Sequence, residues 1–166
     1  MKKIASVIVV ASFFLTAASV AMRADHAHAG QNLKDAKWSP APPLLPKGAE
    51  IAVLEGDPTK PGLYAVRLKF PEHYAIPAHS HPTNEHVVVT SGVLVFGMGD
   101  VLDKRASTNT KLTAGGFVDA SANVNHFAFT RDEETTIVLY GEGPVEFNYV
   151  NPSDDPRNHL NTASRQ

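Results

Sequence analysis

Between residues 49 and 150 the chain consists of short β-rich runs separated by Gly and Pro, and this pattern limits the folds open to it. In the clearest run, residues 62–70, the apolar side chains of Tyr64, Val66 and Leu68 take every second position, which is the period of a strand with one buried face. No stretch of this region shows the 3.6-residue period of an amphipathic helix. Many short strands separated by Gly and Pro predict an all-β sandwich or barrel. The other predicted strands are residues 49–54, 86–90, 93–98, 117–119, 126–129, 135–140 and 145–150.

The first 29 residues have the pattern of a secretory signal peptide. Lys2 and Lys3 precede an apolar stretch over residues 4–20, and Ala27-His28-Ala29 offers a cleavage site. An uncleaved membrane anchor is the alternative, and the small residues at the end of the segment argue against it. We therefore expect a periplasmic or secreted protein with no membrane attachment after cleavage.

Two further segments flank the predicted barrel of residues 49–150. Residues 30–48 contain four prolines, which oppose a helix and a central strand, so we expect an extended arm. Trp38, Leu44 and Leu45 of this arm are expected to pack on the domain's own outer face, although a role as a ligand for another protein is the alternative. Residues 151–166 are predicted to form a frayed polar tail.

Charge and cysteine content narrow the range of functions. The formal net charge is −2, and about −4 once residues 1–29 are removed, because that segment carries three positive charges and one negative charge. No basic patch remains, which argues against nucleic acid as a partner. The sequence has no cysteine, so neither a thiol nucleophile nor a thiolate metal ligand is available.

Four residues have the chemistry and spacing of a metal site. His79 and His81 lie two apart and point to the same face of a strand, and a short turn can bring Glu85 back beside them. His126 lies in a second strand-like run. Three imidazoles and one carboxylate suit one divalent transition metal, Zn, Cu, Fe, Mn or Ni, and suit Mg or Ca poorly. For protein exported unfolded we expect Zn or Cu as isolated, because the affinity order favours them.

This spacing resembles the first motif of the cupin superfamily, which reads Gly, five residues, His-x-His, three or four residues, Glu, six residues, Gly. His79, His81, Glu85 and Gly92 fall on the motif, and His73 replaces its opening Gly. The resemblance is to small single-domain exported cupins and covers roughly residues 50–150. It implies a small jelly-roll barrel with an N-terminal extended arm.

The second cupin motif reads Gly, five residues, Pro-x-Gly, two residues, His, three residues, Asn. Gly115 and His126 match it in register. Its turn residues are replaced, by Ser121, Asn123 and Thr130 in place of Pro, Gly and Asn. The metal ligands therefore match the family pattern, whereas the loop residues around them differ from it.

Two functional interpretations stay open at this stage. In the first, the protein is a metalloenzyme acting on a small organic substrate, and the resemblance implies dioxygenase, lyase, decarboxylase or isomerase chemistry. In the second, it is a non-catalytic module that binds a metal or a small ligand. For an enzyme, the candidate substrate-contacting residues are Arg67, which suits an anionic substrate, and His73 and Tyr74 at the expected barrel mouth. An open cavity beside the metal would distinguish the enzyme from a closed scaffold site.

A homodimer is also predicted. If His126 faces the interior, alternation directs Phe127 and Phe129 outward, and Val88 is directed outward by alternation from Glu85. Exposed aromatic side chains on a sheet need a cover. We expect the arm or a second copy of the chain to supply it.

Overall fold

The computed structural model of the protein describes residue 30 and residues 32–163. The predicted signal peptide, residues 1–29, lies outside the described residues. Within the described part, none of the helices has the length and apolar composition needed to cross a bilayer.

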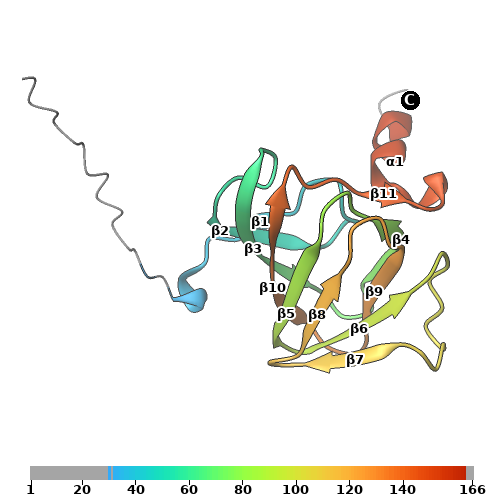
Figure 1. The fold of residues 1–166 in the computed structure, drawn as a ribbon, viewed down its shortest axis with the longest axis horizontal. Helices are drawn as coiled ribbons and strands as arrows, with labels where there is room; N and C mark the ends of the chain where they lie inside the picture. The colour runs from blue at the N-terminus through green and yellow to red at the C-terminus, as the bar shows by residue number, and fades with distance from the viewer. Residues whose placement is uncertain (1–29, 31, 164–166) are drawn as a thin grey trace, which may run out of the picture. The chain divides into compact units, whose positions relative to one another are not determined.

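Two antiparallel sheets form the domain (Figure 1). The six-stranded sheet has the order β1-β2-β3-β10-β5-β8, and the five-stranded sheet has the order β11-β4-β9-β6-β7. Ladder hydrogen bonds do not join the two sheets into one closed ring within the described residues, so packed side chains hold the jelly roll together. The predicted all-β jelly-roll fold is confirmed. The six-stranded sheet comprises β1 (Ser39–Pro40), β2 (Glu50–Glu55), β3 (Gly62–Phe70), β10 (Thr135–Gly143), β5 (Glu85–Ser91) and β8 (Phe117–Ala120). The five-stranded sheet comprises β11 (Asn148–Tyr149), β4 (Ala75–Ser80), β9 (His126–Thr130), β6 (Val93–Met98) and β7 (Thr110–Thr113).

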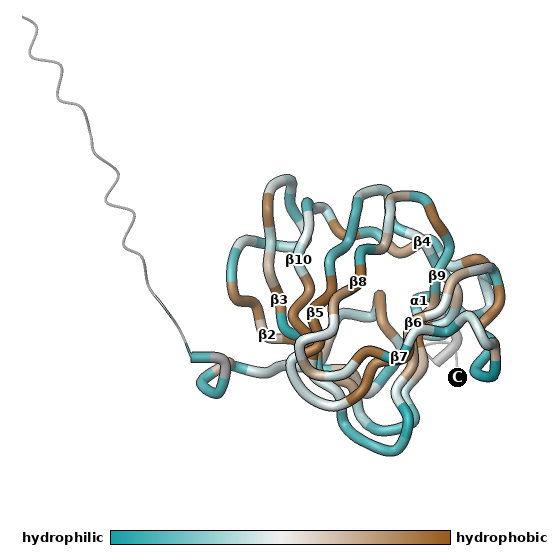
Figure 2. Tube along the Cα trace, turned by 60° about the horizontal axis from the view of Figure 1, so that its bottom comes forward, coloured by the Kyte–Doolittle hydropathy of each residue, from teal (hydrophilic) through white to brown (hydrophobic). Residues whose placement is uncertain are grey.

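The core lies between the two sheets. Every second residue of β3 from Tyr64 to Phe70 is buried, as the alternation of the sequence predicts. Figure 2 shows hydrophobic residues along β2 and β5 and mostly hydrophilic residues in the connecting turns. The β5–β6 turn requires Gly92, because its φ is 75° and a Cβ there would collide with the carbonyl of Glu134.

The outer face of the five-stranded sheet carries a second, smaller apolar cluster. Phe127 and Phe129 face away from the main core, as predicted, but both are buried, with Leu102 of the 99–109 loop packed against their cluster. The ring of Phe127 occupies the space above Gly97, its partner on β6, where a Cβ would overlap the ring. The expectation that the arm or a second subunit covers Phe127 and Phe129 is therefore wrong, because this chain's own loop contributes to their cover.

The arm runs along the edge of the six-stranded sheet. Its two-residue strand β1 pairs with β2, and the ring of Trp38 lies under the guanidinium of Arg67 and the ammonium of Lys69. Two tyrosines hold the segment that follows. The hydroxyl of Tyr74 donates to the carbonyl of Pro46 (2.5 Å), and that of Tyr149 donates to the carbonyl of Leu44 (2.7 Å).

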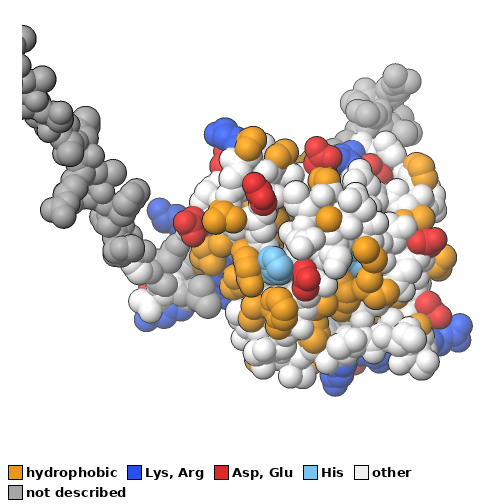
Figure 3. All heavy atoms as spheres, in the orientation of Figure 1, with side chains coloured by type: hydrophobic (Ala, Val, Ile, Leu, Met, Phe, Trp, Pro, Cys, Tyr) orange, Lys and Arg blue, Asp and Glu red, His pale blue; other side chains and the backbone are white. Residues whose placement is uncertain are grey.

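The outer face of the six-stranded sheet remains apolar at its centre. Phe117, His86 and Tyr140 stack in a row across β8, β5 and β10, and Phe117 and Tyr140 are 52% and 39% exposed. Figure 3 shows hydrophobic side chains gathered around a histidine on this face.

Helices form within residues 152–163, so over this described part the prediction of a frayed tail is wrong. A 3-10 turn, η2 (Pro152–Asp154), leads into α1 (Pro156–Ala163), and a further short turn, η1 (Leu33–Asp35), precedes the arm. The side chain of Asp155 accepts a hydrogen bond from the N–H of Arg157 and caps α1. The guanidinium of Arg157 donates to the carbonyl of Phe147 (2.9 Å), which ties the helix to the barrel.

Candidate metal centre

Strand register brings the predicted metal ligands together. His79 pairs directly with His126 across β4 and β9, and Glu85 begins β5 just after the turn that follows His81. The β4–β9 pairing shifts between Ile76 and His79, so that Ala78 and His79 are both buried. This irregularity at Pro77 turns His79 into the interior, as β-bulges near functional sites commonly do.

The three imidazoles form one compact group. One ring nitrogen of each of His79, His81 and His126 lies within 4.8 Å of the others, and all three residues are buried. Three donors at such separations can share one ion at the bond lengths of about 2.0–2.1 Å that imidazole makes to zinc.

Backbone carbonyls fix the tautomer of all three rings. The Nδ1 atom of His79 lies 2.7 Å from the carbonyl of Pro77, that of His81 lies 2.6 Å from the carbonyl of Glu146, and that of His126 lies 2.9 Å from the carbonyl of Val124. A carbonyl only accepts, so each Nδ1 carries the proton and each Nε2 keeps a free lone pair. The Nε2 atoms of His81 and His126 are buried and have no hydrogen-bond partner among the described residues. A metal ion would satisfy these atoms, so the residues fit a divalent metal.

Burial sets the charge of the site. It lowers the pKa of His81 and of His126, and it lowers that of His79 well below the usual value, with a further contribution from the two neighbouring imidazoles. All three rings are therefore neutral, and able to bind a metal, at neutral pH.

Glu85 lies beside this group. Its Oε1 atom is 3.5 Å from Nε2 of His81, and burial raises the pKa of Glu85 to about 7 in the metal-free protein. A buried carboxylate of this kind is stabilised by a nearby cation. The structure thus places all four predicted ligands in one site, with three imidazoles as its compact part.

Aromatic side chains surround the imidazoles, and the most important of them was not predicted. Phe147 stacks on His79 (ring centroids 4.6 Å apart) and meets His81 edge-on (4.5 Å), while Phe96 stacks on His126 (5.2 Å). Phe147 follows β10 and is distant from the ligands in sequence, so no local pattern identifies it. These rings restrict how the imidazoles can turn.

Two hollows lie beside the site. A small one of about 30 Å³ is lined by His79, His126 and Glu85, and has room for about one water molecule. A larger cavity of about 350 Å³ shares Glu85 and Phe147 with it. Of the four predicted ligands, Glu85 lines the larger cavity, so this cavity borders the site at Glu85.

The three candidate substrate-contacting residues do not line this cavity. Arg67 faces outward and lies over Trp38, because β3 directs its alternate residues, Val66 and Leu68, inward. His73 is exposed near Asp132, and its N–H donates to the carbonyl of Arg131, beyond the end of β9 opposite His126. Tyr74 is buried at that same end and holds the arm instead.

The departures from the cupin motifs are compatible with the fold. His73 and Asn123 stand where the motifs have Gly, and these are the two non-glycine residues with positive φ in the described part of the chain (59° and 61°). Thr130, which replaces Asn, is buried and accepts from the N–H of Tyr74 while donating to the carbonyl of Pro71. The substituted residues thus adopt the backbone conformations and make the hydrogen bonds that the turns need.

Comparison with known proteins places the chain in a family. No curated protein matches the sequence. Three similar solved structures are the polyketide cyclase RemF from Streptomyces resistomycificus, an RmlC-like cupin from Shewanella frigidimarina and KdgF from Halomonas sp.. RemF is 13% identical with a TM-score of 0.64, over 80% of this chain and 92% of RemF. The RmlC-like cupin is 16% identical with a TM-score of 0.51, over 68% of this chain and 87% of that one. KdgF is 16% identical with a TM-score of 0.51, over 67% of this chain and 91% of KdgF.

At these identities the likeness concerns the fold. The family described as "Domain of unknown function (DUF4437)" matches residues 22–148. The chain therefore belongs to the DUF4437 family, and its fold is that of the cupins.

Proposed function

We propose that this cupin is a metal-dependent enzyme that acts on a small organic molecule, with lyase, isomerase or dioxygenase chemistry. The observation that carries the proposal is the cavity of about 350 Å³ lined by Glu85, a residue that also lines the small hollow beside His79 and His126. A site that only stores or structurally uses a metal needs no such cavity.

Some residues of the site would bind the ion, and others hold or surround those ligands. His79, His81, His126 and Glu85 would hold one divalent ion, and such an ion supplies positive charge that polarises a bound oxygen. The carbonyls of Pro77, Glu146 and Val124 keep the imidazoles in the tautomer that binds. Phe147 and Phe96 pack against the rings of His79 and His126.

Tyr64 supplies the second polar group of the cavity. It is buried, lines the cavity together with Glu85, and its pKa is raised by burial and by the nearby carboxylate. The phenol therefore stays protonated and can donate a hydrogen bond to a ligand oxygen at any physiological pH.

The test is metal content combined with access to the metal. Protein loaded with zinc should contain one ion per chain, and His81→Ala and His126→Ala should lose most of it. His86→Ala is the matched control, since His86 follows Glu85 on β5 but faces outward beside Tyr140. Cobalt-loaded protein should change its visible spectrum when acetohydroxamate, a small chelator, is added. Loss of metal in the variants with no spectral change on chelator addition would indicate a closed site and contradict the enzyme proposal.

A further inference from the structure

The walls of the cavity next to the metal ligands are mostly apolar. They are formed largely by aliphatic and aromatic side chains, among them Leu44, Ile51, Val66, Leu139, Val145 and Phe147. The residues that line the cavity in the described part of the chain include no lysine or arginine. A negatively charged group lying against this surface would lose its hydration without gaining a cationic partner.

Among the described residues that line the cavity, the buried polar side chains are those of Glu85 and Tyr64. Glu85 and Tyr64 are 7% and 5% exposed, and Glu85 is shared with the small hollow beside the imidazoles. Toward the surface the cavity is bordered by exposed Pro42 and Pro144 and by the half-buried Val145, whose N–H donates to the carbonyl of Pro58. The exposed side chains of Thr59 and Glu146 also line its outer part, so a ligand meets mostly apolar surface and one carboxylate before it reaches Glu85 and Tyr64.

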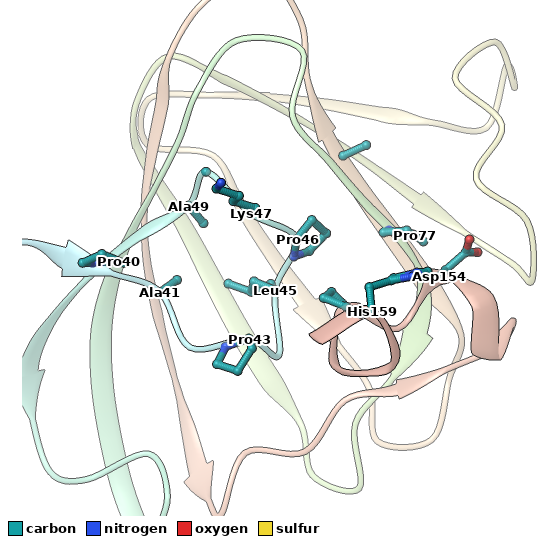
Figure 4. A pocket seen from close by; sticks show the side chains of 13 residues that line it. Pro40, Ala41, Pro43, Leu45, Pro46, Lys47, Ala49, Pro77, Asp154 and His159 are labelled. Atoms are coloured by element: carbon teal, nitrogen blue, oxygen red, sulfur yellow. The ribbon is translucent and has the colours of Figure 1, made fainter. Parts of the chain in front are cut away.

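The proline-rich arm supplies one wall of the cavity. Leu44 and Leu45 line it, and the tyrosine hydroxyls of residues 74 and 149 hold the arm at Pro46 and Leu44. A separate groove of about 640 Å³ lies on the other side of the arm. Figure 4 shows Pro43 bordering this groove, and Leu45 lines both the groove and the cavity. The arm thus separates the cavity from this outer groove.

We propose that the metal centre takes molecules that are polar at one end only, with an oxygen function that reaches the metal ligands and an apolar, aromatic or branched body that lies against the arm. This inference rests on the proposed function and names its substrate class. The cavity volume corresponds to about a dozen water-sized atoms at ~30 Å³ each, which sets the size of such a molecule. Sugars, dicarboxylates and phosphate esters carry further polar or charged groups along the body and fall outside the class.

Two probes of nearly identical shape test this class. 4-Nitrobenzoate and terephthalate share one carboxylate, and differ in whether the far end is a neutral nitro group or a second carboxylate. We expect zinc-loaded protein to bind 4-nitrobenzoate at least tenfold more tightly by titration calorimetry, because the second carboxylate of terephthalate meets the apolar wall. Equal affinity, or tighter binding of terephthalate, would overturn the inference.

A positive charge introduced into the cavity wall tests whether the preference between the two probes arises there. Val145→Lys should improve terephthalate binding by about tenfold and leave 4-nitrobenzoate within a few-fold, because a half-buried lysine can reach the far carboxylate. Pro43→Lys adds the same charge on the groove side of the arm and should change neither affinity. If Pro43→Lys improves terephthalate binding as much as Val145→Lys does, the discrimination comes from overall charge and the assignment of the cavity wall is wrong.

The zinc content of the same samples separates the two proposals. One zinc ion per chain that is lost in His126→Ala, together with no preference between the probes, contradicts only the substrate class. Zinc content that His126→Ala leaves unchanged contradicts the proposed function itself.

Discussion

Phe147 offers the sharpest test of how the site is built, because its ring contacts two of the proposed ligands. It is 7% exposed, stacks on His79 and meets His81 edge-on. Phe147→Ala removes a buried aromatic ring, for which the usual loss in the free energy of unfolding is about 3–5 kcal/mol. In a domain of this size such a loss lowers the Tm by roughly 10–20 °C.

The same change should weaken zinc binding. Residues that orient metal ligands typically contribute about 10–100-fold to metal affinity, and Phe147 restricts the rotation of two imidazoles at once. We expect a decrease in zinc affinity within that range, measured by competition with a chromophoric chelator at a temperature where the variant is fully folded by circular dichroism.

Phe117→Ala is the matched control, since Phe117 is an aromatic residue of the same type that is 52% exposed on the outer face of β8. It should leave the zinc affinity close to that of the unmodified protein, because Phe117 contacts none of the proposed ligands. If Phe147→Ala lowers the Tm but leaves zinc affinity unchanged, the backbone carbonyls alone hold the imidazoles, and the orienting role of the ring is refuted.

Three further predictions concern the surroundings of the site. Gly97→Ala should lower the free energy of unfolding by about 1–3 kcal/mol in urea titrations, because the new Cβ overlaps the ring of Phe127. Gly99→Ala is the control: its Cβ has open space around it, so this variant should show only the strain of its positive φ. The homodimer stays a prediction, and its candidate surface is the stack of Phe117, His86 and Tyr140. Phe117→Glu should yield monomers by light scattering. An unmodified protein that is already monomeric at micromolar concentration would contradict the dimer. Arg157 lowers the pKa of Asp155 below its ordinary value of 3.8. Their contact therefore stabilises α1 above that pH, and the stabilisation is lost as the pH falls through the lower pKa of the folded state. Amide hydrogen exchange in residues 150–159 should become faster at acid pH, and in Arg157→Gln it should already be fast at pH 7.

The sequence contains enough information to identify the residues of the candidate metal site, but not the residues that support them. His79, His81 and Glu85 are close along the chain, and His126 lies in a recognisable strand, so local periodicity and residue chemistry identify them. Phe147 and the carbonyl of Glu146 reach the same site through tertiary packing, and no local signal marks them. The bulge at Pro77 is likewise a feature of strand pairing, which the sequence pattern does not reveal.

Other differences between prediction and structure do have a signal in the sequence. Arg67 alternates with inward-facing Val66 and Leu68, so strand periodicity already directs it outward. Asp155 followed by Pro156 is a typical start of a helix, with a capping carboxylate and a proline in the first turn, although the polar composition of the segment resembles a tail. Gly97 in an apolar strand was a sign that another group approaches the backbone closely, and the ring of Phe127 is that group.

X-ray absorption at the zinc edge tests the central claim most directly, because it reports the atoms bound to the ion. Zinc-loaded protein should show the scattering pattern of three imidazoles with Zn–N distances of about 2.0–2.1 Å, together with oxygen from Glu85. His126→Ala, if it retains any zinc, should show one imidazole fewer, whereas His86→Ala should give the unmodified spectrum. A shell of oxygen atoms with no imidazole scattering, or a spectrum that His126→Ala leaves unchanged, would contradict the assignment of His79, His81, Glu85 and His126 as the metal ligands.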